Sequence, residues 1–457
     1  MLTYEMSKRG QRSLYEYLYQ CIRDDIVKGT LKAGEKLPSK RMLARHLQVS
    51  VVTVENAYQQ LVAEGYVYAQ EKRGYFVGSI ETFVQGEKTA IAYHQEAEKQ
   101  QWRFDLLGGR NTEGFPFSLW AKLMRQVLTE RGETLLESSP SCGVLELREA
   151  IAQYLLQFRG MQVHPSQIII GAGAEYLYDQ MVQLLGNHLC YGVEQPGYPK
   201  VQQVYTLHGA GCARVPLDEG GMQVEAVRQS GAQVLHLSPS HQFPTGVVMP
   251  IGRRQALLKW AEEKPERYII EDDYDSEFRF MGAAIPTLQS IDQAQRVIYI
   301  NTFSRTLAPS LRMGYMVLPP VLIERYHTMM GFYSCTVPVM EQYTLARFLS
   351  QGYFERHLNR MRGLYRNKRD RILELLQNSP LDGQYTVQGA ERGLHFLLKL
   401  PTQTCDRELK QQAEQQKLRL SFLSEYGGGE QHWLLMHYPG IPLEQLEEGL
   451  ALLSKLL

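Results

Sequence analysis

Apolar side chains recur at helical spacing in three successive segments near the start of the chain. The first segment follows Ser13, carries apolar residues every three or four positions, and ends near Gly29. Two further segments follow Ser39 and Ser50, where a serine hydroxyl can accept a hydrogen bond from the first turn of a helix. The pattern therefore predicts three helices, the last of which ends before Gly65.

Two short strands are predicted after these helices. The segments YVYAQ and YFVG have the composition of strands, and the basic turn EKRG joins them. Three helices followed by a two-stranded ribbon form the order of a winged helix-turn-helix. The helix after Ser50 would present its first turn and positive dipole to a DNA duplex, with Lys72 and Arg73 at the tip of the ribbon. On composition alone, a small helical domain with solvated basic residues is an equal alternative.

The pattern changes twice in the rest of the chain. Residues 79–100 lack apolar periodicity and are rich in polar and charged residues, so we interpret them as a linker with weak helical character towards its end. From Trp102 onward, strand-like apolar runs alternate with helical patterns. This alternation predicts an α/β domain with a mostly parallel sheet.

Five strand-like runs of this domain end in segments rich in glycine, proline or polar residues. They are IIIGAGAEYLYD, CYGVEQPGYP, QVLHLSPSHQFPTG, RYIIEDDYDSEF and RVIYINTFSRTLAPSLRMGY. Each segment alone is a weak indication, since Gly-rich turns and solvated acidic loops are common. Ligands of open α/β sheets bind at the carboxyl ends of the strands, so five such ends together predict one ligand site.

Length, charge and cysteine content narrow the class of protein. A chain of 457 residues suggests two or three domains. The net charge is zero, but residues 1–80 carry 12 Lys and Arg against 8 Asp and Glu, which favours DNA binding at the N-terminus. Six cysteines without CxxC spacing favour reduced thiols over disulfides or a metal site. The chain lacks an apolar leader and any long apolar run, so we expect a cytoplasmic protein that does not enter membranes.

The N-terminal segment closely resembles the GntR-type winged helix. GEKLPSKRMLARHLQVSVVTVENAYQQLVAEGYVYAQEKRGYFV matches that family's PSxRxLA, VSRxTVxxAYxxLxxEGY and glycine-containing wing. Val51 replaces the family's usual arginine, which removes one contact to phosphate or base. The resemblance implies that residues 1–78 bind double-stranded DNA through Ser39, Lys40, Arg41, Ser50, Thr53, Asn56, Lys72, Arg73 and Gly74.

The rest of the chain, residues 101–457, resembles the fold-type I aminotransferases. Behind a GntR-type winged helix, this makes the whole chain similar to the MocR-type regulators, and SPSHQFPTG, EDDYDSEFR and TFSRTLAPSLRMGY are specific to that subfamily. The resemblance implies an effector-binding and dimerisation domain, a homodimer and a small-molecule effector. A linker of about twenty residues spans roughly 25 Å, enough for each winged helix to rest on the partner's large domain.

The resemblance also implies a site for pyridoxal 5'-phosphate. Backbone N–H groups of Ala174 and Glu175, at a helix N-terminus, would hold the phosphate. Thr302, Ser304 and Arg312 would add donors, with Arg312 able to bind in bidentate fashion.

Three further residues are assigned to the cofactor's ring. Tyr198 would stack on its face, and Tyr274 would donate a hydrogen bond to its phenolate oxygen. Asp272 would pair with the protonated ring nitrogen, although the neighbouring Asp273 is close enough in sequence to be an alternative.

Arg305 occupies the position at which the family has the lysine that binds the cofactor as an imine. A guanidinium stays protonated and does not form a stable imine, so we expect non-covalent binding and no ordinary transamination. Nothing in the sequence places another lysine, such as Lys200, at this point. Exchange of lysine for arginine is also the change a laboratory would make to block the imine, and the sequence does not separate this from a natural loss.

A second departure concerns the recognition of carboxylates. Where aminotransferase relatives usually supply an arginine for the substrate carboxylate, this chain offers Glu425 and His437, and the alignment of Arg419 is ambiguous. A ligand without an α-carboxylate, or an anionic group bound by Arg305, would fit this pattern.

Three functions follow from these observations. The first is a transcriptional regulator that senses pyridoxal phosphate or its adduct with an amino compound, with DNA occupancy linked to the ligand. The second is an active aminotransferase with an accessory DNA-binding domain, against which Arg305 counts heavily. The third is a regulator whose large domain only dimerises, although such a scaffold would not need Asp272, Tyr274 and Arg312 at strand ends.

Overall fold

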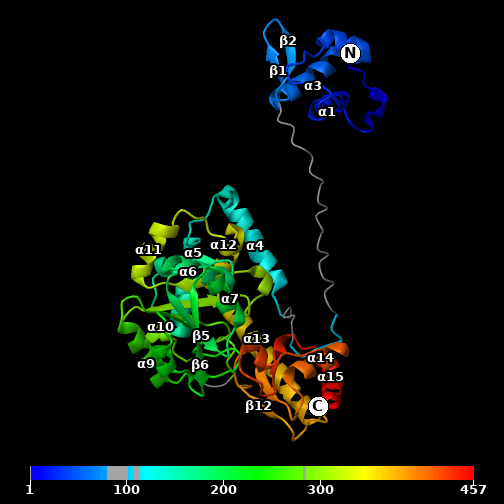
Figure 1. Ribbon diagram of the computed structural model, residues 1–457. Coiled ribbons are helices and arrows are strands. Elements are labelled where there is room, and N and C mark those ends of the chain that lie inside the picture. Colours follow the sequence, from blue (N-terminus) through cyan, green and yellow to red (C-terminus); the bar gives the residue numbers. More distant parts are fainter. Residues whose placement is uncertain (1, 80–100, 108–113, 281–284) are drawn as a thin grey trace. The chain divides into compact units, whose positions relative to one another are not determined.

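The computed structural model describes residues 2–79, 101–107, 114–280 and 285–457 (Figure 1). The chain divides into two compact units, residues 1–98 and 99–457. Apart from its first residue, the predicted linker 79–100 lies outside the described residues, so its predicted weak helical character stays a prediction.

The N-terminal unit contains the predicted helices and ribbon. Leu18, Ile22, Val54, Tyr58 and Leu61 are buried between its helices and form part of its core. The antiparallel ribbon pairs its strands from Val67 opposite Val77 to Gln70 opposite Gly74. The elements are α1 (Leu14–Val27), α2 (Lys40–Leu47), α3 (Val51–Ala63), β1 (Val67–Gln70) and β2 (Gly74–Val77), preceded by a 3-10 helix, η1 (Met6–Arg9).

An eight-stranded sheet organises the second unit, in the order β4-β11-β10-β9-β8-β5-β6-β7. The pairs from β10 through β9, β8 and β5 to β6 are parallel, as the alternating pattern predicted. Strand β11 is antiparallel to both neighbours, and β7 is antiparallel to β6. The strands are β4 (Ile168–Gly171), β5 (Cys190–Gln195), β6 (Gly211–Asp218), β7 (Gly221–Met222), β8 (Val234–Leu237), β9 (Tyr268–Asp272), β10 (Val297–Thr302) and β11 (Gly314–Val317).

Helices cover both faces of this sheet, and alternate residues of each strand pack on opposite faces. Ile169, Ile298 and Ile300 share one core with α6, α7 and α11. Ile170 and Tyr299 share another with α5, α12 and α13. The helices are α4 (Phe117–Arg131), α5 (Leu145–Arg159), α6 (Ala174–Leu185), α7 (Pro199–Leu207), α8 (Val224–Gln229), α9 (Ile251–Glu262), α10 (Leu288–Ile291), α11 (Pro320–Met330), α12 (Val339–Ser350) and α13 (Tyr353–Gln377).

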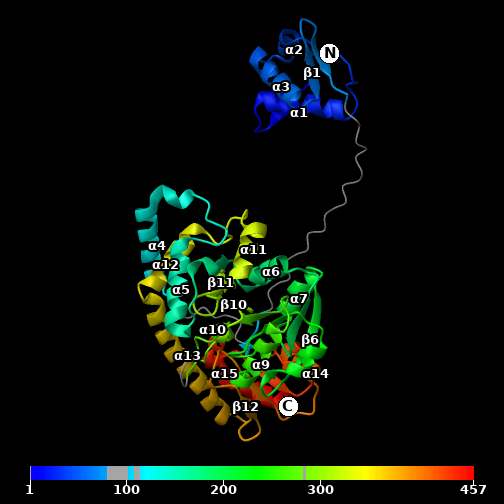
Figure 2. The same ribbon diagram turned by 90° about the vertical axis from the view of Figure 1, so that its left-hand side faces the viewer.

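A smaller antiparallel sheet lies in the C-terminal part of the second unit, in the order β12-β13-β15. The long helix α13 leads into it, and Figure 2 shows this helix in profile. A further strand pair joins β3 to β14. The elements are β3 (Phe104–Asp105), β12 (Thr386–Gln388), β13 (Phe396–Lys399), α14 (Asp406–Gln415), β14 (Leu418–Arg419), β15 (Trp433–Met436) and α15 (Leu443–Leu456).

Within the described ranges, no helix combines the length and the apolar content that crossing a membrane would need. All six cysteines are free thiols.

Candidate functional site

The helix-turn-helix of the N-terminal unit is built on two serine caps. Ser39 Oγ accepts a hydrogen bond from the backbone N–H of Met42 at 3.3 Å, and Ser50 Oγ accepts one from that of Thr53 at 3.0 Å. The Ser50 and Thr53 hydroxyls also lie 2.8 Å apart. Both serines therefore serve as the caps that the sequence predicts, and Ser50 fixes the first turn of α3.

The other predicted DNA contacts are distributed between α2, α3 and the ribbon. Arg41 and Asn56 are exposed, whereas Lys40 is half-buried and pairs with Glu55 at 2.5 Å. This ion pair offsets the charge that Lys40 would offer to phosphate. Lys72 and Arg73 are exposed in the turn between β1 and β2. Gly74 follows them with φ +113°, a conformation that favours glycine.

The five predicted strand ends of the second unit meet at one cavity of about 320 Å³, called here the first cavity. All nine residues predicted to bind the cofactor lie around it. The residues lining it are Ala174, Glu175, Tyr178, Val193, Glu194, Tyr198, Val201, His236, Ser238, Phe243, Asp272, Tyr274, Thr302, Ser304, Arg305, Pro309 and Arg312.

One end of the first cavity is the N-terminus of α6. Its cap residue is Gly173, with φ +95° and no side chain to cap the helix. A Cβ at this position would lie 2.8 Å from Arg312 Nη2, so only glycine allows the guanidinium to approach the helix end this closely. The turn therefore combines N–H groups, a helix dipole and a guanidinium, which together suit an anion.

Glu175 forms ion pairs with two cationic side chains at this end of the cavity. It accepts hydrogen bonds from Arg312 at 2.9 Å and from Lys200 at 3.0 Å. Burial raises the pKa of the Glu175 carboxyl, but the two cations outweigh burial and lower that pKa to about 2. The carboxylate is thus ionised at neutral pH, and Lys200 is held at Glu175 instead of lining the cavity.

Asp272 is the last residue of β9 and lines the first cavity. It accepts a hydrogen bond from the phenol of Tyr178, and its Oδ2 lies 3.3 Å from His236 Nε2. Tyr205 in turn lies 2.6 Å from His236 Nδ1. Burial, with the charge of Asp272, raises the pKa of Tyr178 well above its ordinary value, so Tyr178 remains a neutral donor. These contacts orient the carboxylate towards the cavity.

Asp273 points to the opposite side of the strand. Its Oδ2 pairs with Arg159 at 2.7 Å and accepts from Tyr299 at 2.6 Å. Because side chains alternate along extended backbone, only one of the two neighbouring carboxylates can face the first cavity. The structure places Asp272 there.

Two aromatic residues flank the middle of the first cavity. Tyr198 is 40% exposed, and its ring meets that of Phe243 edge to face at 5.8 Å. The hydroxyl of Tyr274 lies 3.1 Å from His241 Nδ1. Burial and then the charge of Asp275 raise the pKa of Tyr274 well above its ordinary value, which keeps the phenol protonated and able to donate a hydrogen bond.

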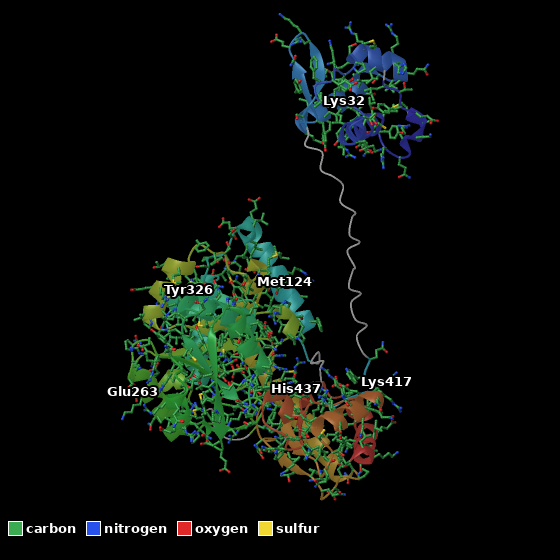
Figure 3. All side chains as sticks on the ribbon, in the orientation of Figure 1. Lys32, Met124, Glu263, Tyr326, Lys417 and His437 are labelled. Carbon is green, nitrogen blue, oxygen red and sulfur yellow. The ribbon has the colours of Figure 1, made fainter. Side chains whose placement is uncertain are left out.

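Arg305 projects into the first cavity from the turn after β10, beside Thr302 and Ser304. Its Nη1 donates to Nε2 of His437 at 2.9 Å. His437, labelled in Figure 3, directly follows β15 in the C-terminal part of the unit. The arginine therefore links the loop after β10 to the C-terminal part of the unit.

The two remaining candidates for carboxylate recognition lie in other ion pairs. Glu425 accepts from Lys410 at 2.6 Å, and Arg419 donates to Asp105 at 3.2 Å. Neither residue lines the first cavity.

Sequence reasoning missed several residues of the first cavity. Glu194 is half-buried; burial raises its pKa to about 8, although hydrogen bonds from Gln242 and Ser238 oppose this. Tyr178 and His236 lie inside a helix and a strand, where an apolar pattern conceals them. His236 could have been found as the polar residue in the buried strand VLHL. Phe243 and Ser238, by contrast, lie in a segment already identified as a strand end.

His241, Asp275 and His395 form the cluster of possible metal ligands that the described residues contain. His241 Nδ1 lies 3.0 Å from both oxygens of Asp275, which is a hydrogen-bond distance. Burial lowers the pKa of His395 to about 3, so that ring is neutral, and its Nε2 lies 3.1 Å from the carbonyl of Pro244. The arrangement fits a hydrogen-bonded histidine–aspartate pair that supports Tyr274.

Two family models match the chain. "Bacterial regulatory proteins, gntR family" matches residues 14–77, and "Aminotransferase class I and II" matches residues 106–452. A GntR-type winged helix joined to an aminotransferase-like unit defines a class of DNA-binding transcriptional regulators. Both resemblances predicted from the sequence are confirmed.

Similar sequences of transcriptional regulators place the chain within that class. The uncharacterized HTH-type transcriptional regulator YdeL of Bacillus subtilis is 38% identical over 410 residues, 89% of this chain and 88% of that protein. The probable rhizopine catabolism regulatory protein MocR of Rhizobium meliloti is 31% identical, over 96% and 92% of the two chains. The pyridoxine biosynthesis regulator PdxR of Corynebacterium glutamicum is 31% identical, over 91% and 89%. The chain belongs to this MocR-type family of HTH-type transcriptional regulators.

Solved aminotransferases share the fold of the second unit. Kynurenine aminotransferase of Pyrococcus horikoshii, solved in complex with PMP, has a TM-score of 0.67 and 25% identity, covering 77% of this chain and 90% of that one. LysN of Thermus thermophilus, complexed with N-(5'-phosphopyridoxyl)-L-leucine, has a TM-score of 0.66 and 25% identity, covering 77% and 91%. The second unit thus has the fold-type I aminotransferase fold.

Proposed function

We propose that the aminotransferase-like unit of this regulator senses pyridoxal 5'-phosphate, or its adduct with an amino compound, and binds it without a covalent bond. The observation that carries the proposal is the first cavity, which combines a helix N-terminus suited to an anion with an oriented carboxylate and the guanidinium of Arg305. A ligand that favours one state of the regulator would shift DNA occupancy by its differential affinity.

The residues of the first cavity fit the phosphate of this cofactor. The N–H groups of Ala174 and Glu175 begin α6, and Gly173 leaves room for the Arg312 guanidinium beside them. Arg312 would exchange its contact with Glu175 for the phosphate, since a dianion attracts it more strongly than one carboxylate. Thr302 and Ser304 line the same cavity and add hydroxyl donors.

The remaining residues fit the ring. Asp272, held by Tyr178 and His236, would accept a hydrogen bond from the protonated ring nitrogen. Tyr274 stays protonated and would donate to the ring oxygen. Tyr198 is exposed enough to pack on one ring face. When bound, the cofactor supplies an aldehyde that reacts with amines.

Arg305 argues against catalysis of transamination. In an aminotransferase, the lysine at this position holds the cofactor and moves a proton at the substrate carbon. A guanidinium remains protonated and cannot act as that base. Arg305 instead places a positive charge in the first cavity, where it would attract an anionic group of the ligand.

The test is a titration of the full-length protein with pyridoxal 5'-phosphate, followed by absorbance. We expect saturable uptake that gel filtration reverses. Arg312→Gln should weaken it about tenfold or more, because a charge-assisted hydrogen bond is lost. Lys200→Gln, which removes a charge at the same end of α6 from outside the cavity lining, is the matched control and should change the affinity far less. The absence of any uptake by the wild-type protein would refute the proposal.

An assay of DNA binding shows whether the bound cofactor changes the affinity for DNA or only occupies the first cavity. Gel shifts on the protein's own promoter region, with and without the cofactor, should give different midpoints for the wild type. Identical midpoints with a fully occupied site would indicate a large unit that binds the cofactor without regulating DNA binding.

A further inference from the structure

A second cavity, of about 250 Å³, lies in the same unit and shares no lining residue with the first. It is bounded by the end of α5, the segment after β9, helix α13 and the turn before β13. Its lining residues are Tyr154, Phe158, Arg159, Ser240, His241, Asp275, Ser276, Glu277, Phe278, Arg279, Ile285, Arg362, Arg392 and Gly393.

The segment after β9 separates the two cavities. Asp272 and Tyr274 line the first cavity, whereas Asp275 and Ser276 line the second. Asp273, between them, pairs with Arg159, which lines the second. One acidic segment therefore supplies side chains to two sites.

Four arginines line the second cavity, against the two carboxyl groups of Asp275 and Glu277. Arg279 and Arg392 face each other across an antiparallel bridge. Burial, and then the nearby charges of Arg392 and Arg159, lower the pKa of Arg279. Arg362 is fixed beside them, with its Nε donating to the Glu277 carbonyl at 2.6 Å. Like charges gathered around a cavity repel one another unless an anion joins them.

The inner wall of the second cavity carries buried polar atoms that find no partner in the described protein. They belong to Arg159 (Nε), His241 (Nε2), Ser276 (Oγ) and Glu277 (Oε2). The side chains of Arg159 and His241 are only 6% and 3% exposed. Leaving such groups unsatisfied is costly, so the donors among them, Arg159 Nε and Ser276 Oγ, indicate a place for a polar ligand.

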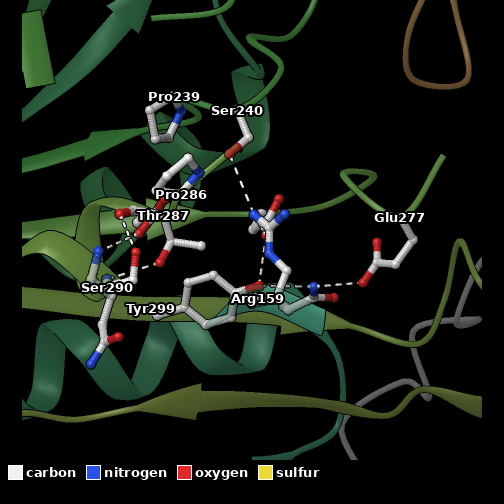
Figure 4. Close-up of polar contacts among 12 residues, drawn as sticks. Arg159, Pro239, Ser240, Glu277, Pro286, Thr287, Ser290 and Tyr299 are labelled. Carbon is white, nitrogen blue, oxygen red and sulfur yellow. Dashed lines mark hydrogen bonds and ion pairs between the residues drawn. The ribbon is translucent and has the colours of Figure 1, made fainter. Parts of the chain in front are cut away.

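Figure 4 shows how firmly this wall is held. Arg159 Nη2 donates to Ser240 Oγ at 3.5 Å and to Asp273 Oδ2 at 2.7 Å. The Tyr299 hydroxyl donates to the same Asp273 oxygen at 2.6 Å. Glu277 Oε1 accepts from Asn301 at 3.0 Å, which fixes the Glu277 side chain in the wall. The wall is therefore organised before any ligand arrives.

We propose that the second cavity binds a small oxyanion, a carboxylate or phosphate, between Arg279 and Arg392 at one side and Arg159 at the other. This goes beyond the proposed cofactor site and does not depend on it. His241 lies in the wall between the cavities, since it lines the second and contacts Tyr274 of the first. An anion bound in the second cavity would thus act on Tyr274 through His241.

The experiment measures binding of succinate and of inorganic phosphate to the full-length protein by calorimetry. All proteins carry Arg312→Gln, so that anions bound in the first cavity are not counted. We expect Arg392→Gln to weaken binding about tenfold or more, and Arg392→Lys, which keeps the charge, to weaken it less. Arg371→Gln, on the same helix as Arg362 but outside the cavity, is the matched control and should leave binding within about twofold.

The two probes identify the ligand class, since preferential binding of either one assigns a carboxylate or a phosphate. Ser276→Ala provides a milder second variant if Arg392→Gln does not fold, and it should also weaken binding measurably. Failure of both probes to bind at millimolar concentration, or binding that neither Arg392→Gln nor Ser276→Ala changes, would overturn the proposal and leave a cavity that holds water.

Discussion

Arg305 Nη1 donates to His437 Nε2 at 2.9 Å, and the guanidinium lines the first cavity, which we propose to bind a phosphorylated ring. The residues of this site come from two parts of the second unit. Gly173, Asp272 and Arg312 are positioned by strand ends of the large sheet, whereas His437 comes from the C-terminal part. A single hydrogen bond from Arg305 thus joins these two parts of the unit at the first cavity.

Arg305→Lys should restore covalent attachment of pyridoxal 5'-phosphate. Lysine offers a nitrogen that can lose its proton and attack the aldehyde, and the other residues of the first cavity are in place. After borohydride treatment, the mass of the variant should rise by one reduced cofactor, while the wild type should stay unmodified. Arg305→Gln is the control, since it also removes the charge but supplies no amine. A labelled wild-type chain would mean that another lysine reaches the aldehyde.

Glu194 should make the stability of the large unit depend on pH. Burial raises its pKa from 4.5 to about 8. Its contribution is therefore fully present below pH 4.5 and is lost as the pH rises through about 8. Glu194→Gln cannot ionise, so its free energy of unfolding should exceed that of the wild type increasingly from pH 5 to pH 8, by at most ~1.4 kcal/mol per pH unit.

Urea unfolding followed by tryptophan fluorescence measures this difference, because all four tryptophans lie in the second unit. The exposed Glu219 supplies the control, and Glu219→Gln should show no such trend with pH. A difference between Glu194→Gln and the wild type that stays constant from pH 5 to pH 8 would contradict the expectation.

Among the helices and strands, features that depend on neighbouring residues could be predicted from the sequence, whereas features that depend on distant segments could not. The caps at Ser39 and Ser50 and the five strand ends were predictable, because a turn residue next to an apolar run acts within a few residues. Strand β11, inserted antiparallel between β4 and β10, was not, since strand order depends on pairing between distant segments. The contact of Arg159 with Asp273 joins residues 114 positions apart, and no local pattern reports it.

The ribbon of the winged helix yields a prediction at this scale. Replacing Lys72 and Arg73 by alanine should weaken DNA binding broadly across sequences, because both side chains are exposed at the turn and suit phosphate contacts. The slope of log affinity against log salt should become shallower by about 1 to 2, since each lost phosphate contact removes about 0.9.

A charge-matched control comes from the opposite end of the same ribbon. Lys28 and Lys32 are exposed, and the loop that carries Lys32 bonds to the Val77 end of β2 through Gly34. Their double replacement by alanine should change affinity and salt slope less than the change at the tip. Equal effects of the two double variants in gel shifts would show that the ribbon tip has no special role.

For the whole molecule, the family organisation leads us to propose a homodimer. The second unit exposes large apolar side chains, including Phe332 at 77% and the neighbouring Tyr333 at 47%, whose rings lie 4.2 Å apart. Exposed aromatic groups of this kind are enriched at protein interfaces. An exchange of winged helices between subunits stays a prediction, because it depends on the segment 80–100 outside the described residues.

Sedimentation velocity at micromolar concentration should therefore give a mass of twice 52.4 kDa. Phe332→Glu should raise the dissociation constant of the dimer at least about tenfold, because a charge would be buried at the interface. Leu207→Glu, at an exposed leucine of α7, is the control and should leave the dimer intact. A wild-type monomer at this concentration would refute the proposal.

The presence of Arg305 in the first cavity also affects the rate at which a ligand would leave it. A site that holds its ligand through hydrogen bonds and ion pairs alone empties at the rate of simple dissociation, with no covalent bond to break first. On the function proposed for the first cavity, its occupancy would follow the free concentration of the cofactor from moment to moment. With a lysine at position 305, a covalent bond would slow release of the cofactor, and occupancy would lag behind a fall in its concentration. With arginine, occupancy would fall as soon as the cofactor dissociates.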